Sequence, residues 1–385
     1  MTGTLQSLGD LLAASEGRRF LEEHEMHLEE GDFVASLRPP ADDGLVRSLG
    51  WDPGDLPVAF GHQICCDYQR SVSCKFHAAR TLGRLPGIVP LFIGVDTDRS
   101  GANRGSSTVT WGEPPAGFAY RLVSNKFRQM ESRFVPVEMA RRQELVTRLA
   151  DWLATAPDLS RSSPWRQRLD AMSDAMADDG VETLADLNRA LTCHLLAQHL
   201  DYRPTVELIS RLGGVLSASV AQAVERIDAF VAVYNEAVAA LVAAGIDPQV
   251  RVLDPDYLPL HYACPKDGRR ERLRHIQQGG DHFAFAQCYC GLEYRFFLGH
   301  GHLSIDEVLA TDSWSTDVTF LIYLNDQISG LIPGRSSALY SVVFADVVRR
   351  VLDGRPVPMF LPVELASSAG NGPDSLMYDY LTEPE

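Results

Sequence analysis

Long apolar runs are missing from this chain of 385 residues. Its longest apolar stretch without Gly or Pro extends from Ala237 to Ala244, whereas a helix that crosses a bilayer needs roughly 20 apolar residues. The opening residues also lack the basic segment and apolar core of a secretory signal peptide. From these absences we expect no membrane partner and a cytoplasmic location.

Basic residues and paired cysteines are also scarce. Lysine and arginine number 35 against 51 aspartates and glutamates, which gives a net charge of −16. Because such a charge repels phosphate backbones, we expect no nucleic-acid partner. Seven cysteines, an odd number, in a chain without an export signal predict reduced thiols or metal thiolates rather than disulfides. The remaining composition, 45% hydrophobic and 22% charged, is typical of a globular protein with a sizeable core.

Two apolar segments with a helical pattern between them indicate an α/β core. The first segment, 56–63, ends in a turn that begins at Gly61. Residues 70–85 then have apolar side chains at helical spacing, and 88–95 is a continuous apolar run that closes on two aspartates. A strand, a helix and a buried strand in this order predict a βαβ unit of a parallel sheet. The loops after both strands are expected to face one crevice.

The rest of the chain divides by its pattern. The clearest helix is expected from Ser217 to Gly245, where apolar residues recur every three or four positions. The predicted fold is α/β, a Rossmann-like parallel sheet core with a helical insertion and a small zinc-ribbon-like segment. The expected divisions are 1–136 (N-terminal half of the Rossmann-like core), 137–250 (helical segment), 251–303 (zinc-ribbon-like segment) and 304–385 (C-terminal part of the core).

Cysteine and histidine gather between positions 261 and 302, which hold three of the seven cysteines and five of the eleven histidines. A zinc ribbon uses two C-x-x-C knuckles, each followed by glycine. Here Cys264 opens the first knuckle and Asp267 stands where its second cysteine would be; Cys288 and Cys290 form a second knuckle that is one residue too short. Either His261 or Asp267 would complete four ligands for Zn²⁺.

Such irregular ligation leaves two roles open for the metal. Structural zinc is the commoner role, but an incomplete ligand set often leaves a coordination position for substrate. In this second case a soft metal could bind a cysteine thiolate in preference to a serine hydroxyl. The alternative is a decayed ribbon that folds without metal and keeps its cysteines as small core residues.

Polar residues at the strand ends are the candidates for chemistry. His62 and Gln63 would orient a substrate, and Lys75 on the following helix would counter negative charge. Asp96 and Asp98 could bind magnesium, accept a substrate amine or serve as a base. Each also has a purely structural interpretation: a satisfied polar turn, a solvated lysine, or an acidic turn that caps the next element.

Together these segments resemble the bacillithiol-biosynthesis cysteine-adding enzyme family (BshC-like), over about half of the chain. That family has a G-Q-Q turn, a helix with lysine, a P-V-F-type strand before acidic residues, and a G-G-P-x-E-x-x-Y turn. The counterparts here are Gly61-His62-Gln63, Lys75, Pro90-Leu91-Phe92 leading to Asp96 and Asp98, and the stretch Pro333-Gly334-Arg335-Ser336-Ser337-Ala338-Leu339-Tyr340. The resemblance implies that substrate contacts Gly61, Gly334, Arg335, Ser337 and Tyr340. The sequence departs from the family at His62 and Ser337.

The resemblance implies an enzyme that joins a cysteine amine to a small molecule. We therefore predict a C–N bond-forming ligase that adds cysteine, or a related amino acid, to a small-molecule acceptor. One alternative is an ATP-dependent amino-acid-activating or adenylyl transferase, with ATP and Mg²⁺ as cofactors. In it the turn Gly299-His300-Gly301-His302, similar to an H-x-G-H signature, would contact phosphates. Another is a non-catalytic zinc-binding interaction protein. A homodimer is compatible with each.

Overall fold

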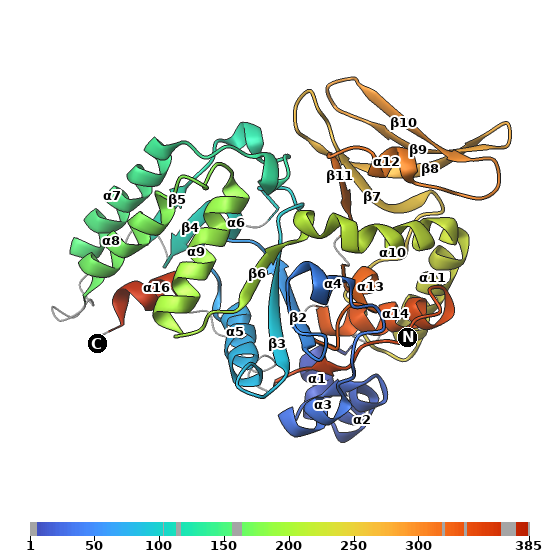
Figure 1. The fold of residues 1–385 in the computed structure, drawn as a ribbon, viewed down its shortest axis with the longest axis horizontal. Coiled ribbons are helices and arrows are strands. Elements are labelled where there is room, and N and C mark those ends of the chain that lie inside the picture. The colour runs from blue at the N-terminus through green and yellow to red at the C-terminus, as the bar shows by residue number, and fades with distance from the viewer. Residues whose placement is uncertain are drawn as a thin grey trace.

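A six-stranded parallel sheet forms the centre of the fold (Figure 1). The computed structural model describes residues 6–102, 104–112, 117–155, 164–317, 320–334, 337–362 and 375–383. The strand order is β1-β13-β12-β2-β3-β6, and neighbouring strands are parallel. The strands are β1 (Met26–His27), β2 (Leu56–Gln63), β3 (Ile88–Val95), β6 (Thr205–Leu208), β12 (Gly330–Ile332) and β13 (Met359–Phe360). The predicted α/β core with a parallel sheet is confirmed.

The unit made of β2, α5 (Arg70–Leu82) and β3 is the one expected from the apolar pattern. The two strands pair in parallel along their whole length, and α5 packs against them through a cluster of aromatic rings. The rings of Phe60, Phe76 and Phe92 have centroids 5.0 to 5.6 Å apart, which suits edge-to-face packing. The helix ends at Leu82, three residues before the expected end, with Gly83 as its C-cap.

In addition to α1–α5 near β1, β2 and β3, two groups of helices lie on either side of the parallel sheet (Figure 1). One group (α7, α8, α9 and α16) packs beside β6 and the hairpin β4–β5, and the other consists of α10, α11, α13 and α14. Within the described ranges, no helix combines the length and the apolar character needed to cross a membrane. The bounds are α1 (Leu8–Ala13), α2 (Ser15–Glu23), α3 (Glu30–Ser36), α4 (Gly44–Ser48), α6 (Arg104–Ser107), α7 (Met139–Thr155), α8 (Trp165–Met176), α9 (Leu184–His199), α10 (Gly213–Glu225), α11 (Ile227–Ala243), α12 (Asp306–Leu309), α13 (Phe320–Leu324), α14 (Ser337–Arg350), α16 (Leu376–Thr382), β4 (Thr108–Trp111), β5 (Phe118–Arg121), and the 3₁₀ turns η1 (Asn125–Phe127), η2 (Ser132–Phe134) and η3 (Ile209–Leu212).

The expected helical segment, 137–250, departs from the prediction in two places. It contains β6, which extends the parallel sheet beyond β3. The single helix expected from Ser217 to Gly245 is two helices, α10 and α11, which meet at Arg226. The guanidinium of Arg226 binds the carboxylate of Asp353, beyond the end of α14. Both helices bury an apolar face, so the apolar spacing continues through the break and does not reveal it.

The expected zinc-ribbon-like segment forms most of a second, antiparallel sheet, which lies over α10 (Figure 1). Its strand order is β10-β9-β8-β7-β11. The strands are β7 (Tyr257–Ala263), β8 (Arg270–Gln278), β9 (Asp281–Gln287), β10 (Glu293–Gly299) and β11 (Trp314–Thr316). The last strand comes from the segment expected to complete the parallel core, so this chain segment contributes to both sheets.

A buried ion network joins the two sheets at Arg270, the first residue of β8. Its Nη1 donates to Asp98 Oδ1 at 3.2 Å, and its Nη2 donates to the carbonyl oxygen of Thr316 at 3.1 Å. Its Nε lies 3.4 Å from Oε1 of Glu131, whose side chain has no exposed surface. The other oxygen of Glu131 accepts a hydrogen bond from Arg133 Nε at 2.6 Å. Since a buried carboxylate without such partners is costly, Glu131 requires both arginines.

Replacing Arg270 should therefore destabilise the fold more than an ordinary surface change. We expect Arg270→Met to lower the free energy of unfolding by about 3 to 5 kcal/mol, because it leaves Glu131 buried without one of its partners. Urea unfolding at neutral pH measures the effect. Arg274→Met on the same strand is the control, since Arg274 and Asp256 form a half-exposed pair at 3.8 Å and should contribute less than about 1 kcal/mol. Equal losses in both variants would contradict this account.

Candidate functional site

The carboxyl ends of β2 and β12 mark the point where the parallel sheet changes direction. From β2 the chain continues to β3 and β6 on one side, and β12 and β13 are added on the other side. In open α/β sheets the helices that follow such strands leave in different directions, and a crevice is expected outside the strand ends. This is the place where sheets of this kind bind ligands, and most of the predicted site residues lie here.

Lys75 is the central side chain of this crevice. It lies on α5 and is 4% exposed, and its Nζ donates a hydrogen bond to the carbonyl oxygen of Gly61 at 2.8 Å. The turn after β12 approaches the same amine: a Cβ added to Gly334 would lie 2.9 Å from Lys75 Nζ and 3.2 Å from Ser337 Oγ. Four predicted site residues from distant parts of the chain therefore lie together: Gly61, Lys75, Gly334 and Ser337.

The charge of Lys75 has no acidic counterpart among the residues that the structure describes. Among the described residues no carboxylate forms an ion pair with it, and burial lowers its pKa from 10.5 to about 8. A buried ammonium without an anion is unfavourable. Lys75 is therefore suited to meet an anionic group of a ligand, or to exchange a proton near neutral pH.

His62 lies beside Lys75 as a neutral imidazole. Burial lowers its pKa to about 4, and the nearby ammonium of Lys75 adds to this effect. Its Nδ1 lies 2.9 Å from the carbonyl oxygen of Gln63, and since a carbonyl can only accept, Nδ1 carries the proton. The Nε2 atom is then left as an acceptor. Gln63 itself donates from Nε2 to the carbonyl oxygen of Arg99 at 3.3 Å, which holds the turn after β2 against the turn after β3.

Asp96 was predicted to contact a ligand, but its side chain points away from the crevice into the protein. Its side chain is fully buried, and it accepts hydrogen bonds from the backbone N–H and the hydroxyl of Ser210. Asp96 therefore fixes η3, and burial raises its pKa. Asp98 is partly exposed and paired with Arg270. Burial also raises the pKa of Asp98, an effect that the guanidinium of Arg270 opposes.

Of the predicted turn at 333–340, Gly334 and Ser337 lie at the crevice beside Lys75. The Ser337 hydroxyl bonds to the backbone of Gly334, which closes the turn before α14. Tyr340 follows one helical turn later, half-buried, with its ring 5.6 Å from that of Phe344. Arg335 lies outside the described residues.

A second candidate site is formed by Cys264, Asp267, Cys288 and Cys290. One ligand atom from each lies within 4.8 Å of the others, so this group could hold a metal ion. The sulfurs of Cys264 and Cys290 are 3.6 Å apart, and the Cys288 sulfur is 3.5 Å from both Asp267 oxygens. In a tetrahedral zinc site the edges would be about 3.8 Å between sulfurs and about 3.5 Å from sulfur to oxygen. The donor set and its spacing therefore fit zinc.

His261 is not part of this group. Because successive side chains of a strand alternate between faces, a residue three positions before Cys264 points away from it. Burial of the imidazole nitrogen and the nearby guanidinium groups of Arg270 and Arg272 lower the pKa of His261 well below the usual value, although the residue as a whole is partly exposed. Its Nδ1 is buried and has no hydrogen-bond partner among the described residues. Of the two residues predicted as the fourth ligand, the structure groups Asp267, and not His261, with the three cysteines that could hold a metal.

The histidines of the GHGH turn lie elsewhere. His300 and His302 are exposed at the end of β10, where they pair with Asp281 and Glu225. Both face solvent rather than the crevice of Lys75.

Two residues of the region are not identified by the sequence patterns above. Arg270 lies in a basic run, and its position directly after the first metal knuckle is a signal that could have identified it. Glu131 has no recognisable motif around it, and only its burial between two arginines reveals its role.

The chain matches no protein-family model and no curated protein. Its function therefore has to be argued from this geometry.

The metal centre gives a direct test of the ligand assignment. We expect purified protein to carry about one equivalent of zinc and Cys288→Ser to retain less than roughly a tenth of an equivalent. Asp267→Ala should weaken binding, so that a chelator removes the metal more readily. His261→Asn should keep the full metal content, and elemental analysis of the folded proteins measures each case. Loss of zinc in His261→Asn with retention in Asp267→Ala would reverse the assignment.

Proposed function

We propose that this chain is an enzyme that forms a C–N bond between an amino acid, cysteine above all, and an anionic small-molecule acceptor. We also assign its parallel sheet to the Rossmann-like class, because the ligand-facing residues lie where the strand order reverses. The resemblance to the cysteine-adding enzymes rests on the residues that meet at this point.

The observation that carries the proposal is the unpaired charge of Lys75. It is buried at the switch point, its pKa is lowered to about 8, and no carboxylate of the described residues pairs with it. A structural lysine would be expected to reach solvent or an acidic partner. An acceptor with a carboxylate or phosphate would supply the missing anion.

Besides an anion-binding group, such a reaction needs a proton acceptor, and His62 beside Lys75 can provide one. When an amine attacks an electrophilic carbon, the C–N bond forms, the amine gives up a proton, and the bond from that carbon to its leaving group breaks, so that the leaving group departs with the bonding electron pair. The unprotonated Nε2 of His62 is an acceptor for that proton. An anion bound to Lys75 would cancel part of the charge that lowers the pKa of His62, and so make His62 a better base. Ser337 stands at the start of α14 on the opposite wall.

The metal is best assigned a structural role within this proposal. Asp267 completes four protein ligands, so a substrate thiolate would first have to displace it. The knuckle also packs on the loop after η1, where Met130 bridges to Arg269, and the backbone N–H of Arg270 donates to the carbonyl of Gln129 at 3.0 Å. Zinc held here would fix the start of β8, from which Arg270 reaches Asp98.

The alternatives make different predictions for one assay. Purified protein is incubated with L-[¹⁵N]cysteine and a small-molecule extract of cells that make it, with and without ATP. We expect a ¹⁵N-labelled conjugate that is detected by mass spectrometry and reduced at least tenfold in Lys75→Met but retained in Lys126→Met. Pyrophosphate release that depends on an amino acid would instead favour the adenylyl transferase. No conjugate under any condition would favour the non-catalytic zinc-binding protein.

The pKa of Lys75 predicts a pH dependence of stability. Between pH 8 and 10.5 the unfolded chain binds the proton that folded Lys75 has lost, so stability contributed by this residue rises with pH. Relative to Lys75→Met, the wild type should gain on the order of 3 kcal/mol across this range. Urea unfolding at several pH values measures the difference. A difference that stays constant, or that falls as the pH rises, would contradict the lowered pKa.

Nuclear magnetic resonance gives an independent measurement, because the chain has only three lysines, Lys75, Lys126 and Lys266. After labelling with [¹³Cε]lysine, the signal that disappears in Lys75→Met should titrate near pH 8.

A further inference from the structure

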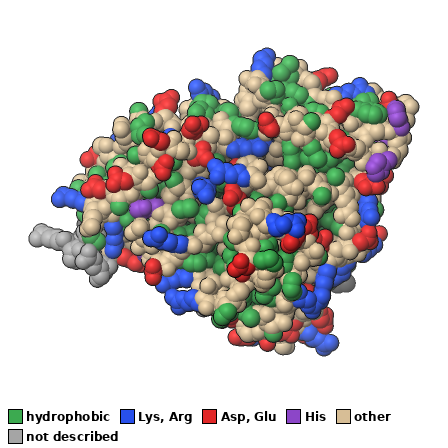
Figure 2. All heavy atoms as spheres, in the orientation of Figure 1, with side chains coloured by type: hydrophobic (Ala, Val, Ile, Leu, Met, Phe, Trp, Pro, Cys, Tyr) green, Lys and Arg blue, Asp and Glu red, His purple; other side chains and the backbone are tan. Residues whose placement is uncertain are grey.

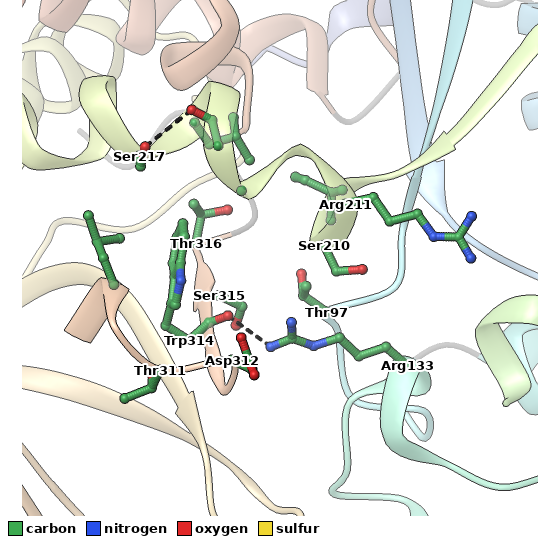
Figure 3. A pocket seen from close by; sticks show the side chains of 15 residues that line it. Thr97, Arg133, Ser210, Arg211, Ser217, Thr311, Asp312, Trp314, Ser315 and Thr316 are labelled. Carbon is green, nitrogen blue, oxygen red and sulfur yellow. Dashed lines mark hydrogen bonds between the residues drawn. The ribbon is translucent and has the colours of Figure 1, made fainter. Parts of the chain in front are cut away.

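A second cavity lies at the carboxyl ends of β3 and β6, next to β11 of the antiparallel sheet. Its volume is about 560 Å³, which is large enough for a small-molecule ligand. Figure 2 shows basic side chains close together near the middle of the face of the molecule that it displays. Figure 3 shows the cavity between Trp314 and Thr316 on one side and Thr97, Ser210 and Arg133 on the other. The reaction proposed above uses none of these side chains.

Two threonine hydroxyls face this cavity without a partner. Thr97 is 4% exposed and Thr316 is 3% exposed, and both line the cavity. No described residue forms a hydrogen bond with either hydroxyl, yet neither oxygen is among the fully enclosed unpaired atoms. Each hydroxyl therefore meets the cavity itself. Polar groups that are buried to this degree normally have a partner, and a ligand in the cavity would provide it.

Arg133 adds a positive charge to the same space. Its Nε is bound by Glu131 and its Nη2 donates to the carbonyl oxygen of Trp314 at 2.8 Å. These contacts hold the guanidinium in place and leave Nη1 without a protein partner among the described residues. Figure 3 shows this group turned toward the cavity, whereas the side chain of Arg211 points away from it.

The amino end of α10 completes the polar wall. The helix starts at Gly213, and no side chain caps it. A helix of 13 residues carries a partial positive charge at this end, which favours an anion. A Cβ on Gly214 would meet no atom within 4 Å, so a ligand can approach the backbone closely there.

The other walls limit what this ligand can be. The indole of Trp314 provides an apolar surface beside Gly213, with a ring carbon 3.5 Å from where a Cβ on that glycine would lie. Asp312, an exposed residue, also lines the cavity (Figure 3). Asp312 would repel a ligand with several negative charges, so a single oxyanion is favoured.

We propose that this cavity binds a small molecule through one carboxylate or phosphate group. The oxyanion lies between the amino end of α10, Arg133 and the hydroxyls of Thr97 and Thr316, and an apolar part of the molecule contacts Trp314. This site is separate from the crevice of Lys75, and it does not depend on the reaction proposed for that crevice.

Calorimetric titration of the full chain tests the site with defined probes. Phenylacetate and phenyl phosphate combine an oxyanion with an apolar ring, inorganic phosphate lacks the ring, and benzyl alcohol lacks the charge. We expect at least one of the two ring-bearing anions to bind, and benzyl alcohol not to bind. Binding of phenylacetate alone identifies a carboxylate site, and binding of phenyl phosphate and phosphate identifies a phosphate site.

A pair of matched variants locates the binding. Gly214→Glu places a negative charge in the cavity and should weaken binding roughly tenfold or more. An acidic residue is favourable in the first turn of a helix, so the variant should fold. Gly31→Glu is the control, because Gly31 is also the second residue of a helix and also has open space around it. Asp312→Asn should strengthen binding, since it removes a repelling charge.

Three results would overturn the proposal. The first is that neither ring-bearing anion binds the wild type. The second is that Gly214→Glu binds as tightly as the wild type, and the third is that Gly31→Glu is weakened to the same extent.

Discussion

The buried carboxylate of Glu131 is the constraint on which the arrangement of the two sheets depends. Its side chain has no exposed surface, and three groups compensate its charge: the guanidinium groups of Arg133 and Arg270 and the hydroxyl of Ser315. These partners come from η2, β8 and β11, so the charge is satisfied only when the antiparallel sheet is seated on the parallel core. An unpaired carboxylate at this depth would cost several kcal/mol. The network therefore specifies one relative position of the sheets.

Comparison with Lys75 separates structural charges from charges that face a ligand. Glu131, Asp96 and Asp67 are all buried, and each accepts hydrogen bonds or ion pairs from described residues. Lys75 is buried to a similar degree, but its described hydrogen bond is to a single backbone carbonyl. Among the described residues, buried Arg142 also lacks a carboxylate within ion-pair distance, but it donates to three backbone carbonyls, whereas Lys75 at the switch point of the sheet donates to one. This contrast is the strongest reason to place ligand binding there.

Features that depend on local pattern could be predicted from the sequence. The apolar runs of β2 and β3 and the helical spacing of α5 each depend on one short stretch, and the structure confirms them. The meeting of Lys75 with Gly334 followed from a resemblance between motifs rather than from spacing. The strands β1 and β13, of two residues each, are too short to leave a pattern. Their pairing depends on the edge that the rest of the sheet provides.

The candidate sites, like the fold, could be predicted only where they depend on one short stretch of sequence. The residue types of the metal centre are evident in the sequence, but the exclusion of His261 required the strand β7 that the structure shows, along which side chains alternate between faces. The turning of Asp96 toward Ser210 could not be foreseen, because η3 lies more than a hundred residues further along the chain. Glu131 escapes prediction for the same reason, since its partners come from three separate elements.

The segment that follows β3 lies between the cavity beside α10 and the turn that carries Gln63. Asp96 is fixed by η3 and Asp98 by Arg270, so alternate residues anchor the segment. Between them, Thr97 faces the cavity beside α10, and the carbonyl of Arg99 accepts the hydrogen bond from Gln63 at the edge of the Lys75 crevice. The same short segment therefore contributes a hydroxyl to the proposed anion site and a carbonyl to the turn beside Lys75, so a shift of this segment would alter both.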